Sequence, residues 1–484
     1  MAKHKNNSIG FTDLNIPVVV ELDATFDKQT LVIELLTILL KSQPKYLFAV
    51  PVWFLMGQQR LQKEIGRRIP IDACLIPYRA ELLDYLRRQF AKGRTVVLTS
   101  GTDEQLARRV AKDLRISAQI VTTHGSCGNP GPKLKRACLV QGFGDKGFDY
   151  VANGSGDWAM WSAARKAVLI NPSAQLLRMV SRVTQVQDVF EDRRARIRDY
   201  WNALRPTHWL KNCLVFVALY DGHILNEPAL LGKALLAFVA LCLCTSSGYL
   251  VNDVFDLAVD RRHPQKRRRP FASGLLPLSY AFTMTPALLI TSCVLSVLVS
   301  PFLLETVLIY IALSLAYSLR LKTVVLLDVI VLAGLYTLRI LSGAAVTGEW
   351  PSEWLLASSM FLFSSLALVK RYDELVVMRS IDGDNAKARS YSLSDAELLA
   401  SMGAASGFAA ILTFVLYIWH SSAQLYGRHE VVWFLCPLLL YWLVHIWLTA
   451  HRGRLREDPV VFALHDKTSR NLLVLMWIDV LLAA

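Results

Sequence analysis

Long apolar runs dominate the chain from about residue 206 onward, and short polar loops separate them. Each run is long enough, or nearly long enough, to cross a bilayer, which takes about 20 helical residues. We therefore expect an all-α polytopic membrane bundle of about nine transmembrane helices. The predicted spans are 209–227, 231–251, 277–298, 301–318, 324–345, 353–369, 400–420, 431–449 and 470–484.

The first 200 residues follow a different pattern, in which short apolar stretches alternate with longer charged ones. The predicted strands are 18–22, 95–99, 118–122, 148–152 and 167–170, and the predicted helices are 28–41 and 103–114. Strands that alternate with helices are typical of a parallel, doubly wound sheet. Residues 172–200 are predicted to form a charged helical linker. We therefore expect an α/β, Rossmann-like domain at 1–200 and a membrane domain at 201–484.

The basic residues orient the spans. With residue 205 in the cytosol, nine spans place 252–276, 319–323, 370–399 and 450–469 inside, and the outside loops then contain one arginine. This distribution follows the positive-inside rule. The N-terminus lacks the apolar core of a signal peptide. We expect a multi-pass protein of a bacterial inner membrane with its first domain in the cytosol.

The composition narrows the range of partners. Lys and Arg exceed Asp and Glu, giving a formal net charge of +14, and 53% of the residues are hydrophobic. Such a charge suits nucleic acid, an anionic membrane surface or phosphorylated substrates. With so many apolar runs, we expect a membrane and no nucleic acid. None of the eight cysteines forms a Cys-x-x-Cys pair, which favours buried thiols in a reducing compartment.

Acidic residues gather where the second apolar run ends. Asp253, Asp256 and Asp260 are spaced three and four apart, so on one helix they would share a face, with Asn252 beside them. Clustered carboxylates repel one another unless a cation neutralises them. Oxygen ligands suit Mg²⁺, which also keeps phosphate oxygens in its shell. These four residues are the predicted metal ligands, and Asp253 and Asp256 are also predicted to be catalytic.

A basic run follows the carboxylates, and its residues Lys266 and Arg269 are expected to bind the phosphates of a substrate. An acidic cluster followed by a basic one is what a Mg²⁺–diphosphate site requires. The alternative is an ordinary positive-inside loop. That alternative explains the basic residues and leaves the carboxylates unexplained.

The stretch Tyr249–Gly274, YLVNDVFDLAVDRRHPQKRRRPFASG, resembles the first aspartate-rich motif of the UbiA superfamily of intramembrane prenyltransferases, N-D-x-x-D-x-x-x-D. Its H-P-x-K-R-x-R-P continuation is similar to the decaprenyl-phosphate phosphoribosyltransferase branch. So is Arg205–Asn212, which matches that branch's R-P-x-x-W-x-K-N. The resemblance covers roughly 205–484 and implies Mg²⁺ as cofactor.

The resemblance also implies a second polar cluster at another span end. The best match is 370–374, Lys-Arg-Tyr-Asp-Glu, where the superfamily's common D-x-x-x-D is absent. Lys-Arg-Tyr followed by an acid looks like the phosphoribosyltransferase branch instead. Lys370, Arg371, Tyr372 and Glu374 are therefore expected to bind substrate.

Ionisable residues near or inside the spans are further candidates. Asp328 and Arg339 lie within one predicted span, share a helix face, and are functional candidates because charge at membrane depth is costly. Lys211 opens the first span and is expected to bind phosphate during catalysis. Lys322 lies at the cytoplasmic mouth, where phosphate binding and a plain positive-inside role are both open.

Two reactions fit this set of residues. In the first, a polyprenyl phosphate attacks phosphoribosyl diphosphate and diphosphate leaves. In the second, a prenyl diphosphate ionises and an aromatic acceptor captures the cation. Both use a polyprenyl lipid and a diphosphate-containing donor, and the branch-like motifs favour the first. A flippase for lipid-linked sugars would have no use for aligned carboxylates, and whether the chain forms a homo-oligomer stays open.

The first domain resembles haloacid-dehalogenase-like phosphatases. Residues 18–26, VVVELDATF, are similar to that family's D-x-D-G-T signature, in which the first Asp is the nucleophile. Glu21 stands in that position, while Asp23 remains. Because glutamate is one methylene longer, its carboxylate should miss the in-line geometry of phosphoryl transfer.

The other motifs of that family have partial matches, which are Ser100, Lys135 (or Lys133), Asn153 and Asp157. Asn153 stands where an aspartate is common. The domain has two possible roles, and the substitutions at Glu21 and Asn153 favour the second of them. One is a phosphatase that acts on a lipid-linked ribose 5-phosphate. The other is a degenerate domain that binds a ligand or serves as a scaffold.

Overall fold

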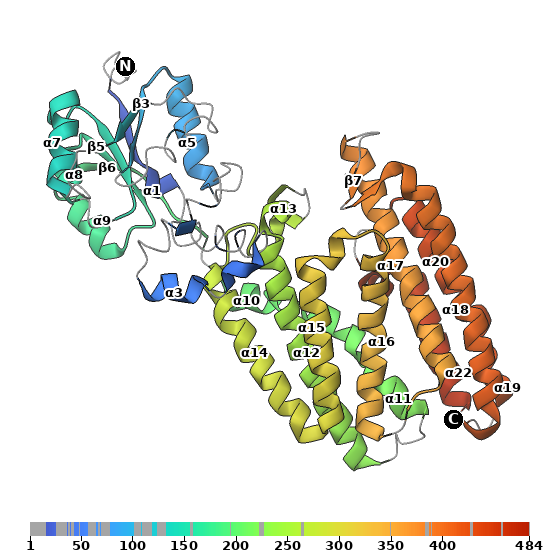
Figure 1. Cartoon of the computed structure of the whole chain (residues 1–484). Coiled ribbons are helices and arrows are strands. Elements are labelled where there is room, and N and C mark those ends of the chain that lie inside the picture. Colours follow the sequence, from blue (N-terminus) through green and yellow to red (C-terminus); the bar gives the residue numbers. More distant parts are fainter. Residues whose placement is uncertain are drawn as a thin grey trace, which may run out of the picture. The chain divides into compact units, whose positions relative to one another are not determined.

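The structure is a computed structural model. It describes residues 16–25, 36, 39, 43–47, 49–56, 64–65, 68, 78–100, 108, 119–122, 132–154, 158–193, 195–221, 227–262, 266–348, 350–382, 387–388, 390–425, 429–455 and 458–483. The chain divides into two units, which Figure 1 colours along the sequence. The first unit comprises Met1–Arg196 and Leu257–Leu278, and the second comprises Ile197–Asp256 and Ser279–Ala484.

The first unit is built on a six-stranded sheet with the order β3-β2-β1-β4-β5-β6. Its strands are β1 (Val18–Glu21), β2 (Val96–Ser100), β3 (Gln119–Thr122), β4 (Asp149–Ala152), β5 (Lys166–Ile170) and β6 (Gln185–Phe190). Every adjacent pair is parallel. The predicted parallel sheet is confirmed, and β1 lies where the strand order reverses.

Helices cover both faces of this sheet, as Figure 1 shows. Successive residues of a strand point to opposite faces. Val18 and Val20 accordingly pack with Leu82 and Leu86 of α5 (Ala80–Ala91). Val19 packs in a second core with residues of α7 (Pro132–Phe143), α8 (Trp158–Ala163) and α9 (Ala174–Val180). Three short helices, α1 (Leu22–Thr25), the 3-10 helix η1 (Pro44–Leu47) and α3 (Ala49–Leu55), precede α5.

The prediction of a helical linker over 172–200 is wrong. This stretch holds α9, the strand β6 and the start of α10 (Ile197–Ala203). Along β6, exposed and half-buried residues alternate. Three of its six residues are polar and none is fully buried, which disguises the strand in the sequence.

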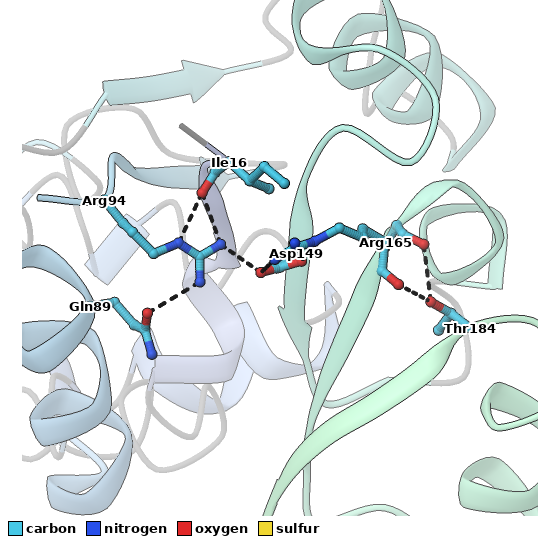
Figure 2. A network of polar contacts seen from close by, with 7 residues as sticks. Ile16, Gln89, Arg94, Asp149, Arg165 and Thr184 are labelled. Atoms are coloured by element: carbon cyan, nitrogen blue, oxygen red, sulfur yellow. Dashed lines mark hydrogen bonds and ion pairs between the residues drawn. The ribbon is translucent and has the colours of Figure 1, made fainter. Parts of the chain in front are cut away.

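A buried ion network ties the amino ends of the strands together (Figure 2). Asp149, the first residue of β4, accepts hydrogen bonds from Arg165 Nε at 2.9 Å and from Arg94 Nη2 at 2.5 Å. Arg94 also donates to the carbonyl of Ile16 and to the side chain of Gln89. We call Arg94, Asp149 and Arg165 the arginine clamp. It joins the segments that lead into β1, β2, β4 and β5.

The second unit is helical. Its elements after α10 are η4 (Pro206–Leu214, a 3-10 helix), α11 (Val215–Asp221), α12 (Pro228–Phe255), α14 (Leu278–Val299), α15 (Pro301–Leu319), α16 (Leu327–Thr347), α17 (Glu353–Asp382), α18 (Ala396–Leu425), α19 (His429–Val432), α20 (Leu435–His451), α21 (Pro459–His465) and α22 (Lys467–Ala483). A short hairpin of β7 (Lys387–Ala388) and β8 (Tyr391–Ser392) follows α17. Every predicted span overlaps one or more of these helices.

Six of these helices are long and apolar enough to cross a membrane: α12, α14, α15, α16, α17 and α18. The chain is therefore an integral membrane protein. The prediction of about nine spans is confirmed for these six. The remaining three predicted spans correspond to shorter helices in the described residues. They are η4 with α11, α20 at 17 residues, and α22 at 17 residues.

Helix α16 lies at the centre of this unit and carries several of the predicted site residues. It packs against η4, α11, α15 and α17. Gly343 permits the approach of α11, because a Cβ at this position would lie 2.1 Å from the carbonyl oxygen of Val215. This close crossing brings the end of η4 against α16, which the site below depends on.

Candidate active site

The aspartate-rich motif does not lie on one helix. Helix α12 ends at Phe255, Asp256 caps it with φ −96° and ψ 4°, and Asp260 belongs to a separate short helix, α13 (Leu257–Arg262). The expectation that all three aspartates share one helix face is therefore wrong, because the backbone leaves the helical conformation at Asp256. Asn252, Asp253 and Asp256 remain together in the last turn and cap of α12.

Basic residues hold both carboxylates at this end of α12. Lys322, from the 3-10 helix η6 (Leu321–Thr323), donates to Asn252 Oδ1 at 3.0 Å and to Asp256 Oδ1 at 2.5 Å. Arg205 donates to Asp253. Arg205, the N-cap of η4, has a left-handed backbone with φ 53°. The structure thus brings Lys322 to the predicted metal ligands and adds Arg205, which the sequence reading did not select.

The donors at this site fit Mg²⁺ chemically. Among the described residues there is no group of three or more His, Cys, Asp or Glu side chains that could hold a metal ion. Mg²⁺ does not need such a group, because one or two carboxylates together with water and substrate phosphates usually bind it. Asp253 and Asp256 supply two carboxylates, Asn252 supplies an amide oxygen, and cations already balance the acidic charge.

The loop after α13 contains its own ion pair. Arg269 Nη1 donates to Asp260 Oδ2 at 2.6 Å, and Asp260 is buried. Lys266 begins the short 3-10 helix η5 (Lys266–Arg268). The roles of Asp260 as a metal ligand and of Lys266 and Arg269 as phosphate ligands stay predictions.

The structure directs the side chains at 370–372 to different neighbours, because consecutive residues of a helix point in different directions. Lys370 Nζ lies 3.1 Å from Asp458 Oδ2. Arg371 turns to Asp328. The hydroxyl of Tyr372 lies 2.9 Å from Nδ1 of His451 on α20. Their roles as substrate ligands stay predictions.

Arg371 is fully buried and lies at the centre of a polar network. Its Nε donates to Asp328 at 2.6 Å, its Nη1 to Glu374 at 2.6 Å and its Nη2 to the hydroxyl of Tyr317 at 2.9 Å. Tyr391 of β8 donates to the other oxygen of Asp328 at 2.7 Å. This network joins α15, α16, α17 and β8. It neutralises Asp328, which explains how a carboxylate is tolerated in this apolar helix.

Arg339 is buried among neutral partners. It donates to Asn212 Oδ1 at 2.8 Å, to the carbonyl of Leu335 at 2.6 Å and to the hydroxyl of Tyr310 at 2.8 Å. Its guanidinium also lies 4.9 Å from the ring centroid of Tyr336. Arg339 and Asp328 therefore belong to different networks, and no carboxylate of the described residues forms an ion pair with Arg339.

Lys211 pairs with Asp458, a residue that the sequence reading missed. Lys211 Nζ lies 2.7 Å from Asp458 Oδ1 and 5.3 Å from the ring centroid of Tyr336. Asp458 is the N-cap of α21 and precedes Pro459. That sequence context reads as an ordinary helix start, so only the fold reveals its two lysine partners.

The charges of this group shift two pKa values outside the six long spans. Burial opposes ionisation of Asp458, but the charges of Lys211 and Lys370 outweigh it and lower the pKa of the carboxyl well below its usual range. Burial, helped by the charge of Lys211, lowers the pKa of His208 to about 3. His208 is therefore neutral at pH 7, and its surroundings are electropositive.

The first unit has its own candidate site at the carboxyl end of β1, where parallel sheets bind ligands. Lys135 of α7 donates to Glu21 Oε1 at 2.8 Å. Ser100 ends β2, and Asn153 follows β4. Asp23 lies in α1, and Lys133 in α7. Asp157 lies outside the described residues.

Comparisons with known proteins bear on both units. Residues 212–467, more than half of the chain, match the UbiA prenyltransferase family. The chain is 32% identical over 480 residues to protein y4nM of Sinorhizobium fredii, covering 97% of this chain and 92% of the relative. It is 31% identical over 289 residues to decaprenyl-phosphate phosphoribosyltransferase of Mycobacterium tuberculosis, covering 58% of this chain and 92% of the relative.

A solved structure is also similar, that of a UbiA homolog from Archaeoglobus fulgidus bound to GPP and Mg²⁺. The TM-score is 0.47 and the sequence identity 16%, over 58% of this chain and 99% of that one. The family match and the relatives at more than 30% identity decide the assignment. The chain is a transferase of the UbiA prenyltransferase family.

Proposed function

We propose that the membrane unit transfers a phosphoribosyl group from phosphoribosyl diphosphate to a polyprenyl phosphate lipid. The observation that carries this proposal is the similarity to decaprenyl-phosphate phosphoribosyltransferase, which extends over 92% of that relative. The end of α12 supports it, because Asn252, Asp253 and Asp256 offer oxygen ligands beside Lys322 and Arg205. Mg²⁺ bound there would neutralise the diphosphate of the donor.

In the proposed reaction, a phosphate oxygen of the lipid attacks the anomeric carbon of the donor. The new C–O bond forms as the bond from that carbon to the diphosphate breaks, and diphosphate leaves with the electron pair. Asn252, Asp253 and Asp256 would hold the metal, and Lys322 and Arg205 would turn from the carboxylates toward the phosphates. Preorganised charge of this kind stabilises a leaving anion in a site that excludes water.

The first unit is proposed to be a haloacid-dehalogenase-like domain facing the cytosol of a bacterial inner-membrane protein. Its parallel sheet and the Glu21–Lys135 pair at the end of β1 support this assignment. Glu21 in place of the nucleophilic aspartate favours ligand binding or a scaffold role over hydrolysis. The proposed domain boundary is near residue 200.

The test is a transfer assay with the full chain in membrane vesicles. We expect label from phosphoribosyl diphosphate to enter the lipid phase when a polyprenyl phosphate and Mg²⁺ are present. Asp253→Asn should abolish this transfer, whereas Asp84→Asn, which removes an exposed carboxylate of α5, should not change it. No label in the lipid, together with prenyl transfer from a prenyl diphosphate to an aromatic acceptor, would replace the proposal with the second reaction.

A further inference from the structure

A second group of cations lies away from the carboxylates of α12, at the other end of η4. Lys211 from η4 and Lys370 from α17 each contact one oxygen of Asp458, at 2.7 Å and 3.1 Å. The side chain of Lys211 is 5% exposed, that of Asp458 10% and that of Lys370 35%. We call these three residues the lysine pair with its counter-ion. Lys370 is the member that solvent or a ligand can reach.

The charge in this region exceeds what Asp458 can neutralise. The ring of Tyr336 lies 5.3 Å from the ammonium of Lys211 and 4.9 Å from the guanidinium of Arg339. Within the described parts of the chain, the hydrogen-bond partners of Arg339 are neutral groups, those of Asn212, Tyr310 and Leu335. Among the described residues, Lys211, Lys370 and Arg339 together with Asp458 leave an excess of two positive charges beside the half-buried ring of Tyr336. In a low-dielectric interior this excess of positive charge strongly favours the binding of an anion.

The chemistry of the group fits a phosphate monoester. Such an ester carries about −1.5 to −2 charges at pH 7, which matches the excess. Lysine binds phosphate as a point charge on a flexible stem. Lys370 can therefore exchange a carboxylate for a phosphate oxygen without rebuilding the helix that carries it.

The 3-10 helix η4 connects this group to the end of α12. Arg205 at its N-cap pairs with Asp253, and Lys211 pairs with Asp458. Six residues of 3-10 helix span about 12 Å, at about 2.0 Å per residue. Two anion sites at the two ends of one rigid element would hold two phosphorylated substrates at a fixed separation.

We propose that Lys211 and Lys370, in the field of Arg339, bind the phosphate of the acceptor lipid, and that Asp458 is the internal counter-ion which this phosphate displaces from Lys370. The inference rests on the proposed transfer to a polyprenyl phosphate. It names the acceptor's binding site and makes Asp458 a positioning residue. The carboxylate keeps both lysines in place and charged until the lipid arrives.

The test measures binding of farnesyl phosphate to the full chain in nanodiscs of zwitterionic lipid, without Mg²⁺ and without donor. Calorimetry should give a Kd that Lys370→Gln raises at least ten-fold and Asp458→Asn lowers, because the competing carboxylate is gone. Lys370→Arg keeps the charge but holds Asp458 with paired bonds, so its Kd should lie between those of the wild type and Lys370→Gln. The matched control is Arg454→Gln, an exposed cation four residues before Asp458, which should leave the Kd unchanged.

Other outcomes overturn the inference. A Kd that responds to Lys322→Gln and not to Lys370→Gln would place the phosphate at the end of α12. Equal binding of farnesol would show that the chain recognises only the hydrocarbon. Displacement of farnesyl phosphate by equimolar inorganic phosphate or ribose 5-phosphate would assign the site to a soluble phosphate or to the donor.

The assay separates this inference from the proposed function. If farnesyl phosphate binds through Lys370 but no label reaches the lipid in the transfer assay, the proposed function fails and the phosphate site stands. If label is transferred while Lys370→Gln binds farnesyl phosphate normally, the site assignment alone fails.

Discussion

Each unit of the molecule holds a buried aspartate between two basic residues. In the first unit, Asp149 lies between Arg94 and Arg165, and it is fully buried. In the second, Asp458 lies between Lys211 and Lys370. The two groups have the same charge count and differ in the identity of the cation.

That difference determines how firmly each carboxylate is held. Arg165 binds both oxygens of Asp149, at 2.9 Å and 2.8 Å, while Arg94 also anchors the backbone of Ile16 (Figure 2). A planar guanidinium forms such paired bonds in one orientation only. Each lysine of the other group contributes one contact, and Lys370 remains partly exposed.

The comparison suggests that arginine pairs fix a fold, whereas lysine pairs hold a carboxylate that can be exchanged. The arginine clamp lies at the amino ends of the strands, away from the carboxyl end of β1 where Glu21 and Lys135 meet. Lys322 repeats the lysine pattern with Asp256 at the end of α12. Carboxylates held by lysine therefore coincide with the proposed substrate sites, where Asp253, held by Arg205, is the exception.

Asp149→Asn should give the largest effect, and the effect should be on stability. The change leaves two arginines in the clamp without their carboxylate. Breaking a buried ion pair in this way lowers the free energy of unfolding by about 3–5 kcal/mol. The rate of amide hydrogen exchange in β4 and β5 of the full chain measures this loss of stability. Asp145→Asn, an exposed carboxylate in the same unit, is the control. Exchange that is as slow in Asp149→Asn as in the wild type would remove the structural role of the clamp.

Asp256→Asn should act on catalysis and leave the fold intact. Losing one carboxylate of the proposed metal site removes charge stabilisation worth about 10²- to 10³-fold in kcat, or about 2.7–4 kcal/mol. The transfer assay and a thermal unfolding curve in detergent measure the two effects. Glu227→Gln removes an exposed charge at the opposite end of α12 and should retain activity. A large loss of thermal stability in Asp256→Asn would contradict the division between lysine-held and arginine-held carboxylates.

Local patterns in the sequence predicted much of this organisation. The short apolar run at β1 and the long apolar runs of the six spans gave correct elements. Asp256 and Lys322 were both selected, because each lies beside a span end. The break of α12 at Asp256 was missed, since the spacing of three and four fits a continuous helix equally well and only the cap geometry distinguishes them.

Contacts between distant segments were not predictable in the same way. Asp458 meets Lys211 and Lys370 across 247 and 88 residues of chain, and its local sequence is that of a helix cap. Strand β6 was missed because three of its six residues are polar and none is fully buried, so the sequence shows no apolar run there. Arg371 was taken as a substrate ligand from its motif, although its position in the fold directs it to Asp328 and Glu374.

Lys322→Arg tests whether the geometry of the cation beside Asp256 matters, because the change preserves the charge. A guanidinium would hold Asp256 with paired bonds and release it less readily. We expect kcat to fall about 30-fold, or about 2 kcal/mol, with unchanged thermal stability. Arg320→Lys makes the reverse change at an exposed site two residues away and should have no effect. Full activity in Lys322→Arg would mean that cation geometry does not matter at this carboxylate.

The smallest effect should be a pH dependence of stability in the region of the lysine pair. Burial and the charge of Lys211 lower the pKa of His208 from 6.5 to about 3. Between these values the unfolded chain binds a proton that the folded chain does not, so stability falls as the pH decreases below about 6.5. At pH 5.5 this loss amounts to about 1.4 kcal/mol. The melting temperature in detergent should therefore decrease from pH 7.5 to 5.5, and His208→Gln should flatten the decrease. His420→Gln, which changes an exposed histidine, should leave the slope as in the wild type. An unaltered slope in His208→Gln would show that folding does not lower the pKa of His208.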